Sequence, residues 1–152
     1  MTEQQNNYLE LSDSGDLVRL ESIELIKYDS DIDWDKNWLK TQVTVKGGKF
    51  SGQYLGEFMT FDFEKLKQEL SRLYDNLKGT ANFNDLEGYL ELKIEGDGIG
   101  HYEVEVKACD QPGINESTLT FTMNIDQTEL KELINQLDRI TQQFPITGDI
   151  KI

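Results

Sequence analysis

The sequence predicts an α+β fold, in which a mostly antiparallel, curved sheet of about seven or eight strands carries two amphipathic helices on one face. Apolar residues recur at helical spacing in two segments, at about 62–77 and 126–143. Most of the remaining chain alternates apolar and polar residues, as half-buried strands do. No linker rich in Gly, Ser or Pro interrupts the pattern, so residues 1–152 are expected to form one domain, with residues 1–7 disordered.

The N-terminal segment is expected to form two strands. Alternating apolar residues indicate a short strand at residues 9–11 and a longer one at residues 18–25. Within the longer strand, the apolar positions change parity between Leu20 and Ile23. A β-bulge near residues 21–22 would bring both sets of apolar side chains to one face.

The next pair of strands is predicted to form a hairpin around Gly47-Gly48. Residues 41–45 and 50–54 alternate in the strand pattern, and two glycines suit a two-residue turn of the primed type. This turn would pair Val45 with Phe50.

The first helix is predicted at about residues 62–77. Its apolar stripe consists of Phe63, Leu66, Leu70, Leu73, Tyr74 and Leu77. Asp62 suits the N-cap, because a carboxylate accepts hydrogen bonds from the free N–H groups of the first turn. Gly79 stands where a left-handed residue would end the helix.

The second helix is predicted at about residues 126–143. Asp126 and Glu129 have capping-box spacing, and Pro145 is expected to follow the last turn. A shift of 64 residues superimposes this strand-to-helix junction on that of the first helix. Either an internal duplication or the general chemistry of helix capping explains the match.

A second hairpin is predicted around the glycine-rich run 96–100. A three-residue loop at residues 97–99 would pair Ile94 with Tyr102 and place the apolar residues of both strands on one face. This register sets Glu91 opposite Glu105, a destabilising like-charge pair. The outward face then holds five glutamates and two lysines: Glu87, Glu91, Glu95, Glu103, Glu105, Lys93 and Lys107. Such a face either docks a basic protein or only keeps the chain in solution.

The charge balance excludes several classes of partner. The chain has 29 acidic and 15 basic residues and a net charge of −14. Binding to nucleic acid or to an anionic membrane surface needs clusters of Lys and Arg, which are absent from the sequence. One cysteine permits neither an intrachain disulfide nor a multi-cysteine zinc site. Without a signal-like segment or an apolar run of about 18 residues, we expect a cytoplasmic protein.

An acidic segment with two tryptophans follows the second strand. It comprises Asp29, Asp31, Asp33, Trp34, Asp35 and, three residues later, Trp38. The spacing resembles the start of an EF-hand loop, but Trp34 and Lys40 replace the required Gly and Glu. These departures disfavour calcium binding but leave it open, beside two other interpretations: a solvated acidic loop, and a partner-binding loop that joins charge steering to aromatic anchors.

The sequence does not indicate catalysis. His101 and Cys109 are predicted on the outward face of one strand, roughly 26 Å apart, so they cannot form a nucleophile–base pair within it. No carboxylate pair is singled out by its spacing on a helix. We therefore expect a protein that is not an enzyme and that binds neither a cofactor nor a metal.

Several short motifs occur in an order that resembles a known family. They are residues 35–39 before a strand, 48–52, Asp62-Phe63 at the head of a helix that ends at 73–79, 86–88, 96–101, and 125–128 before the final helix. Their order over about residues 28–145 resembles the WapI-type immunity proteins, the partners of wall-associated polymorphic toxins, and related bacterial proteins. The resemblance implies a cytosolic protein that binds the toxic C-terminal domain of a delivered effector. It transfers no catalytic or binding residues.

The leading hypothesis is an immunity protein that covers the basic active-site surface of a cognate toxin domain, expected to be a nuclease. Its partner-binding residues would come from the acidic segment, from the glutamate-rich face, or from both. The alternative is a small-ligand or ion-binding module that uses the cup between sheet and helices. That cup would be lined by Phe50, Tyr54, Phe58 and Tyr102. The sequence leaves the oligomeric state open.

Overall fold

The computed structural model describes residues 5–152, so the expected disorder of residues 1–7 falls partly outside it. The elements follow one another as β1 (Tyr8–Asp13), β2 (Asp16–Leu25), the 3-10 helix η1 (Asp33–Asn37), β3 (Trp38–Gly47), β4 (Phe50–Met59), α1 (Thr60–Asn76), β5 (Lys78–Asn84), β6 (Leu90–Asp97), β7 (His101–Cys109), β8 (Thr118–Asp126) and α2 (Gln127–Gln143). Neither helix is long and apolar enough to cross a membrane.

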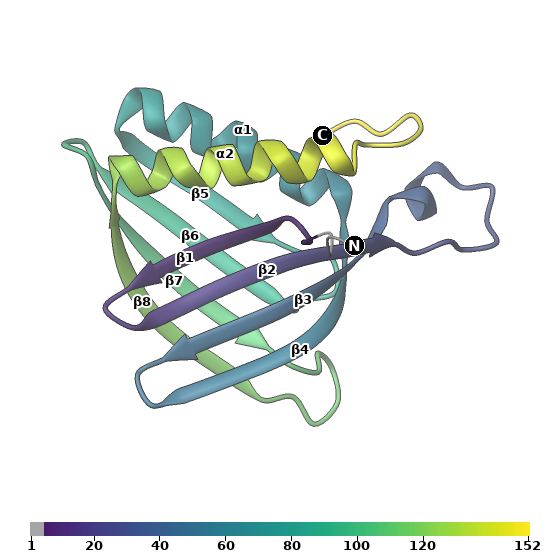
Figure 1. Cartoon of the computed structure of the whole chain (residues 1–152), viewed down its shortest axis with the longest axis horizontal. Coiled ribbons are helices and arrows are strands. Elements are labelled where there is room, and N and C mark those ends of the chain that lie inside the picture. The colour runs from purple at the N-terminus through teal and green to yellow at the C-terminus, as the bar shows by residue number, and fades with distance from the viewer. Residues whose placement is uncertain (1–4) are drawn as a thin grey trace.

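The strands form two antiparallel four-stranded sheets, ordered β1-β2-β3-β4 and β5-β6-β7-β8. Figure 1 shows that the strands of one sheet cross behind those of the other and that the two helices lie side by side. Helix α1 packs on edge strand β5, and α2 packs on edge strand β1. The α+β class, with eight antiparallel strands and two helices, is confirmed. The two strand-to-helix junctions that match at a shift of 64 residues occupy equivalent places: β4, the fourth strand of one sheet, leads into α1, and β8, the fourth strand of the other, leads into α2.

The inner faces of both sheets and the apolar stripes of both helices form one main core. Phe58 lies at its centre, with the ring centroids of Phe63 and Phe83 at 6.3 and 6.0 Å. The proposed ligand cup is not formed by its predicted residues, because Phe58 and Tyr102 are fully buried in this core while Phe50 is 73 % exposed. Tyr54 instead donates a hydrogen bond to the backbone oxygen of Tyr89.

The first predicted hairpin has the correct faces but the wrong register. Gly47 pairs with Phe50, and Val45 with Gly52, so the turn consists of Gly48 and Lys49. Gly48 has a φ of +61°, which suits the first position of a primed turn. Gly47 remains in the strand, where a Cβ atom would lie 2.8 Å from the ring of Phe121.

The second hairpin is also displaced by two residues from the predicted pairing. Ile94 pairs with Val104 and Gly96 with Tyr102. The carboxylate of Asp97 accepts the backbone N–H groups of Ile99 and His101, which moves the loop to residues 98–100. The two registers share the same parity, so the predicted inner and outer faces are retained.

The β-bulge is confirmed, with the register shift between Ser22 and Glu24. The helix predicted at about 62–77 is confirmed as α1, but both predicted caps are wrong: Met59 rather than Asp62 is the N-cap, and Leu77 rather than Gly79 is the left-handed C-cap, with a φ of 64°. The C-cap lies there because β5 starts at the very next residue.

For α2, the Asp126 cap is confirmed, since its carboxylate accepts the N–H of Glu129 at 2.9 Å. The helix ends at Gln143, two residues before Pro145.

Asp62 lies in the first turn of α1, where its carboxylate accepts the N–H of Met59 at 3.4 Å. Burial raises its pKa to about 7, and the nearby charge of Asp85 adds to the shift. A carboxyl whose pKa is raised by folding binds more protons in the folded state between pH 4 and pH 7. Its contribution to stability is therefore present at low pH and is lost as the pH rises to about 7.

We expect Asp62→Asn to stabilise the protein by about 1–2 kcal/mol at pH 8 and to change little near pH 4.5. This change in the free energy of unfolding is smaller than the value that the full pKa shift corresponds to, because the carboxylate is partly exposed to water. The amide can still accept the N–H of Met59. Urea unfolding at both pH values measures the difference, with Asp75→Asn on the exposed face of α1 as control. Equal pH profiles for the two variants would contradict the expectation.

Candidate partner-binding surface

The acidic segment forms a loop, here the aspartate loop (residues 28–37), that joins β2 to β3. Figure 1 shows it projecting from one end of the molecule beside the C-terminal segment. Its second half is the short helix η1, in which Asp33 and Asp35 occupy the first turn. Asp29 and Asp31 precede this helix and are exposed.

The loop is fixed by the side chain of Asn37, which is completely buried. Its Nδ2 donates to the backbone oxygens of Asp33 and Thr147, both at 2.9 Å. Its Oδ1 accepts the hydroxyl of Thr60 and the N–H of Thr147, both at 2.8 Å. One amide thus joins the aspartate loop, the start of α1 and the C-terminal segment. The sequence did not indicate this role, although Asn37 stands in the first of the family-like motifs.

Two of the predicted aspartates serve the loop itself. Asp33 accepts the N–H of Asp149 at 3.0 Å and pairs with Lys36 at 2.8 Å. The N–H of Asp149 and, after it, the ammonium group of Lys36 lower the pKa of Asp33. Asp35 accepts the hydroxyl of Ser30 and the indole N–H of Trp38. Asp29 and Asp31 are therefore the carboxylates of this loop best placed for a partner.

The two predicted tryptophans differ in accessibility. Trp38 is only 9 % exposed and packs with Met59 and Phe61 in a small second core, so it does not present a surface anchor. Trp34 is 40 % exposed and lies 4.6 Å from Phe61 between ring centroids. The difference arises because the C-terminal segment packs against the cluster that contains Trp38, and the local sequence does not reveal this contact.

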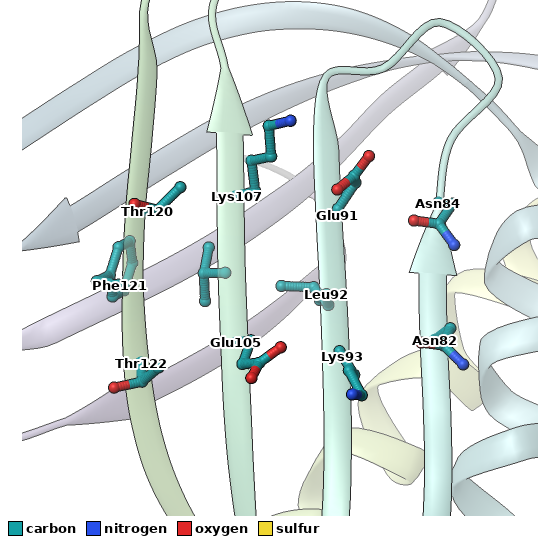
Figure 2. A pocket seen from close by; sticks show the side chains of 11 residues that line it. Asn82, Asn84, Glu91, Leu92, Lys93, Glu105, Lys107, Thr120, Phe121 and Thr122 are labelled. Carbon is teal, nitrogen blue, oxygen red and sulfur yellow. The ribbon is translucent and has the colours of Figure 1, made fainter.

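The outer face of β5–β8 gathers the four predicted glutamates, and it contains a shallow hollow of about 590 Å³. Figure 2 shows that asparagines from β5 and threonines from β8 flank charged side chains from β6 and β7. The observed register sets Glu91 opposite Lys107 and Glu105 opposite Lys93. The like-charge pair is thus Glu95 with Glu103, not Glu91 with Glu105 as predicted. The middle of this face is nearly balanced in charge.

The two predicted sites do not form one surface. The Glu95–Glu103 pair lies beside the β6–β7 turn, at the opposite end of the molecule from the aspartate loop (Figure 1). Over residues 5–152, no group of three or more His, Cys, Asp or Glu side chains is arranged to hold a metal ion. The aspartate loop combines exposed carboxylates with an exposed tryptophan, and it is therefore the stronger candidate for binding a protein.

A comparison with protein families decides the broad function. Residues 9–145 match the model of the immunity protein WapI-like family. The chain belongs to this family. Membership implies an immunity function, with a toxin as the cognate partner, and the family is one that suggests a non-enzymatic protein. No curated protein matches this WapI-like chain.

Solved structures share the fold of this WapI-like protein. A structure of the plant transcriptional regulator PBF-2 matches with a TM-score of 0.51 at 13 % identity, covering 94 % of this chain and 84 % of that one. WHY1 from Arabidopsis thaliana gives 0.53 at 14 %, covering 96 % and 88 %. MRP1/MRP2 from trypanosomes gives 0.52 at 9 %, covering 92 % and 86 %. At such identities the likeness concerns the fold alone.

Proposed function

We propose that this WapI-like immunity protein is a cytoplasmic inhibitor that neutralises a nuclease toxin by covering its basic active-site surface. The observation that carries the nuclease assignment is the net charge of −14. A nuclease needs Lys and Arg to hold phosphates, so its active-site surface is complementary to an acidic protein. Charge complementarity also speeds association, which suits an inhibitor that must act before its partner cuts.

The aspartate loop supports this proposal because it is held in one conformation before binding. Its shape is fixed by hydrogen bonds of Asn37 and Asp33 to the distant C-terminal segment and by local hydrogen bonds of Asp35. A partner that binds a preformed loop does not have to order it, which removes one cost of association. Asp29 and Asp31 remain exposed on that framework.

Co-expression with the toxin tests the proposal. The probe is a candidate toxin domain, namely the C-terminal domain of any large secreted protein that a neighbouring gene encodes, produced with and without the immunity protein. We expect a 1:1 complex, rescue of growth, and inhibition of RNA or DNA cleavage by the purified domain. Failure to bind and protect would overturn the immunity assignment for this pair. Protection against a domain without nuclease activity would overturn only the nuclease assignment.

We expect the double substitution Asp29→Lys/Asp31→Lys to slow association with that domain about tenfold at low salt, because steering depends on charge near the contact. Its association rate should also depend less on salt. Stopped-flow fluorescence over a range of NaCl concentrations measures both effects. Glu95→Lys/Glu103→Lys makes the same change in net charge at the other end of the molecule and should slow association much less. Equal slowing by the two pairs would rule out the aspartate loop as the contact.

A further inference from the structure

Resting on the proposed function, we infer that three neighbouring loops form the toxin-docking face, and that its partner is a basic protein domain with apolar pockets bordered by Lys or Arg. The three loops, here the loop end, are residues 26–37 between β2 and β3, 85–89 between β5 and β6, and 110–117 between β7 and β8. Apart from Glu87, no residue of the second and third loops was a candidate in the sequence.

Exposed apolar side chains gather at the loop end. Ten large hydrophobic residues within residues 5–152 are exposed; five of them lie in these three loops, and a sixth, Leu25, is the last residue of β2, where the first loop begins. They are Leu25 (36 %), Tyr28 (45 %), Ile32 (64 %), Trp34 (40 %), Leu86 (60 %) and Ile114 (72 %). Single exposed apolar residues are ordinary, whereas a group on one end of a molecule marks an interaction site.

The three loops adjoin one another. The hydroxyl of Tyr28 donates to Glu57 on β4 at 2.7 Å. The ring of Tyr89 in the second loop lies against the same strand, with its centroid 5.8 Å from that of Phe58, so the first and second loops meet neighbouring residues of β4. The second and third loops touch, since a Cβ atom on Gly88 would stand 3.8 Å from the Cβ of Pro112.

The charge of the loop end identifies the kind of partner. Lys27 and Lys36 are the basic residues in the three loops, and Lys36 is paired with Asp33. The exposed apolar groups are accompanied by Asp29, Asp31, Glu57, Glu87, Asp110 and Glu116. A second copy of this chain would bring the same negative charge to the contact, so self-association is disfavoured and a basic protein is favoured.

Each loop is also stiffened by a carboxylate of its own. In the second loop, the carboxylate of Asp85 accepts the N–H groups of Gly88, Tyr89 and Leu90 at 2.8–3.0 Å. In the third, Glu116 accepts the N–H of Gly113 at 3.1 Å. With Asp33 and Asp35 in the first loop, the apolar side chains are presented on fixed backbone, which is typical of surfaces with binding hot spots.

The inference is tested by measuring how substitutions in the loop end change the dissociation constant (Kd) for the toxin domain described above. We expect Leu86→Ser and Ile114→Ser each to raise Kd about tenfold or more, and Trp34→Ala to raise it about 30-fold or more. Ile99→Ser is the matched control, because Ile99 is 77 % exposed but lies in the β6–β7 turn at the opposite end. It should change Kd by less than about twofold. The melting temperatures of the three serine variants should stay near that of the wild type.

Three outcomes would overturn the inference. If the wild type binds the toxin domain but Ile99→Ser or Glu95→Lys/Glu103→Lys weakens binding more than the loop variants, docking occurs elsewhere and the immunity function stands. If the wild type dimerises in sedimentation experiments and Ile114→Ser makes it monomeric, the loop end is a self-association surface. If the wild type neither binds nor protects, the inference fails together with the proposed function.

Discussion

Asn37→Leu is expected to destabilise the protein by about 3–4 kcal/mol. Leucine branches at Cγ as asparagine does but is bulkier, so the change removes four hydrogen bonds at a position with no exposure to water and also crowds that position. The Thr60 hydroxyl and the N–H of Thr147 would each lose a buried partner. Each buried polar group left without a partner costs about 1–3 kcal/mol, and local relaxation recovers part of that sum.

Urea unfolding measures this loss, and two variants bracket it. Thr60→Val removes one of the four bonds and should cost about 1 kcal/mol. Asn82→Leu makes the same substitution on the exposed face of β5 and should stay within about 0.5 kcal/mol of the wild type. If Asn37→Leu were no worse than Asn82→Leu, the Asn37 amide would not hold the loop and the C-terminal segment together.

The fold could be predicted where local signals suffice. The Asp126 cap and Pro145 bound α2 correctly because both act within a few residues of the helix ends. Strand alternation predicted which residues face the core. It could not predict the register of either hairpin, because two registers that differ by two residues place the same side chains on the inner face. The choice between them rests on turn geometry at Gly48 and on the Asp97 side chain. Alternation also cannot show that the strands form two sheets. Inward-facing residues alternate in the same way in one continuous sheet and in two separate sheets.

The candidate surface was predicted in part, for a similar reason. Composition located the aspartate loop, but it could not separate Asp31 from Asp33 or Trp34 from Trp38. Those roles are assigned by the C-terminal segment, which reaches Asn37 from 110 residues away. Leu86 and Ile114 were missed, although a signal existed: each is an apolar residue within an otherwise polar, glycine-containing turn.

Gly96→Ala is expected to destabilise the protein by about 3 kcal/mol or more, because of how α1 is joined to the second sheet. Leu77 ends α1 in the left-handed conformation, and its carbonyl oxygen accepts the N–H of Gly98 at 3.1 Å. That oxygen lies against Gly96 on β6, so a Cβ atom there would overlap it. The ring of Tyr102 would also stand 3.0 Å away. Since the obstacle is backbone within a hydrogen-bonded cap, β6 would have to move away from the helix end.

Gly52→Ala provides the matched control for this expectation. Gly52 also lies in a strand, but a Cβ atom there would meet only Val45, at 3.9 Å. Alanine at that position should leave stability within about 0.5–1 kcal/mol of the wild type, with a gain from the less flexible unfolded chain. Urea unfolding of the two variants compares a helix-to-sheet contact with an open strand position. Equal stabilities would mean that β6 can shift away from Leu77 at little cost, and that the close approach does not fix how the second sheet sits against α1.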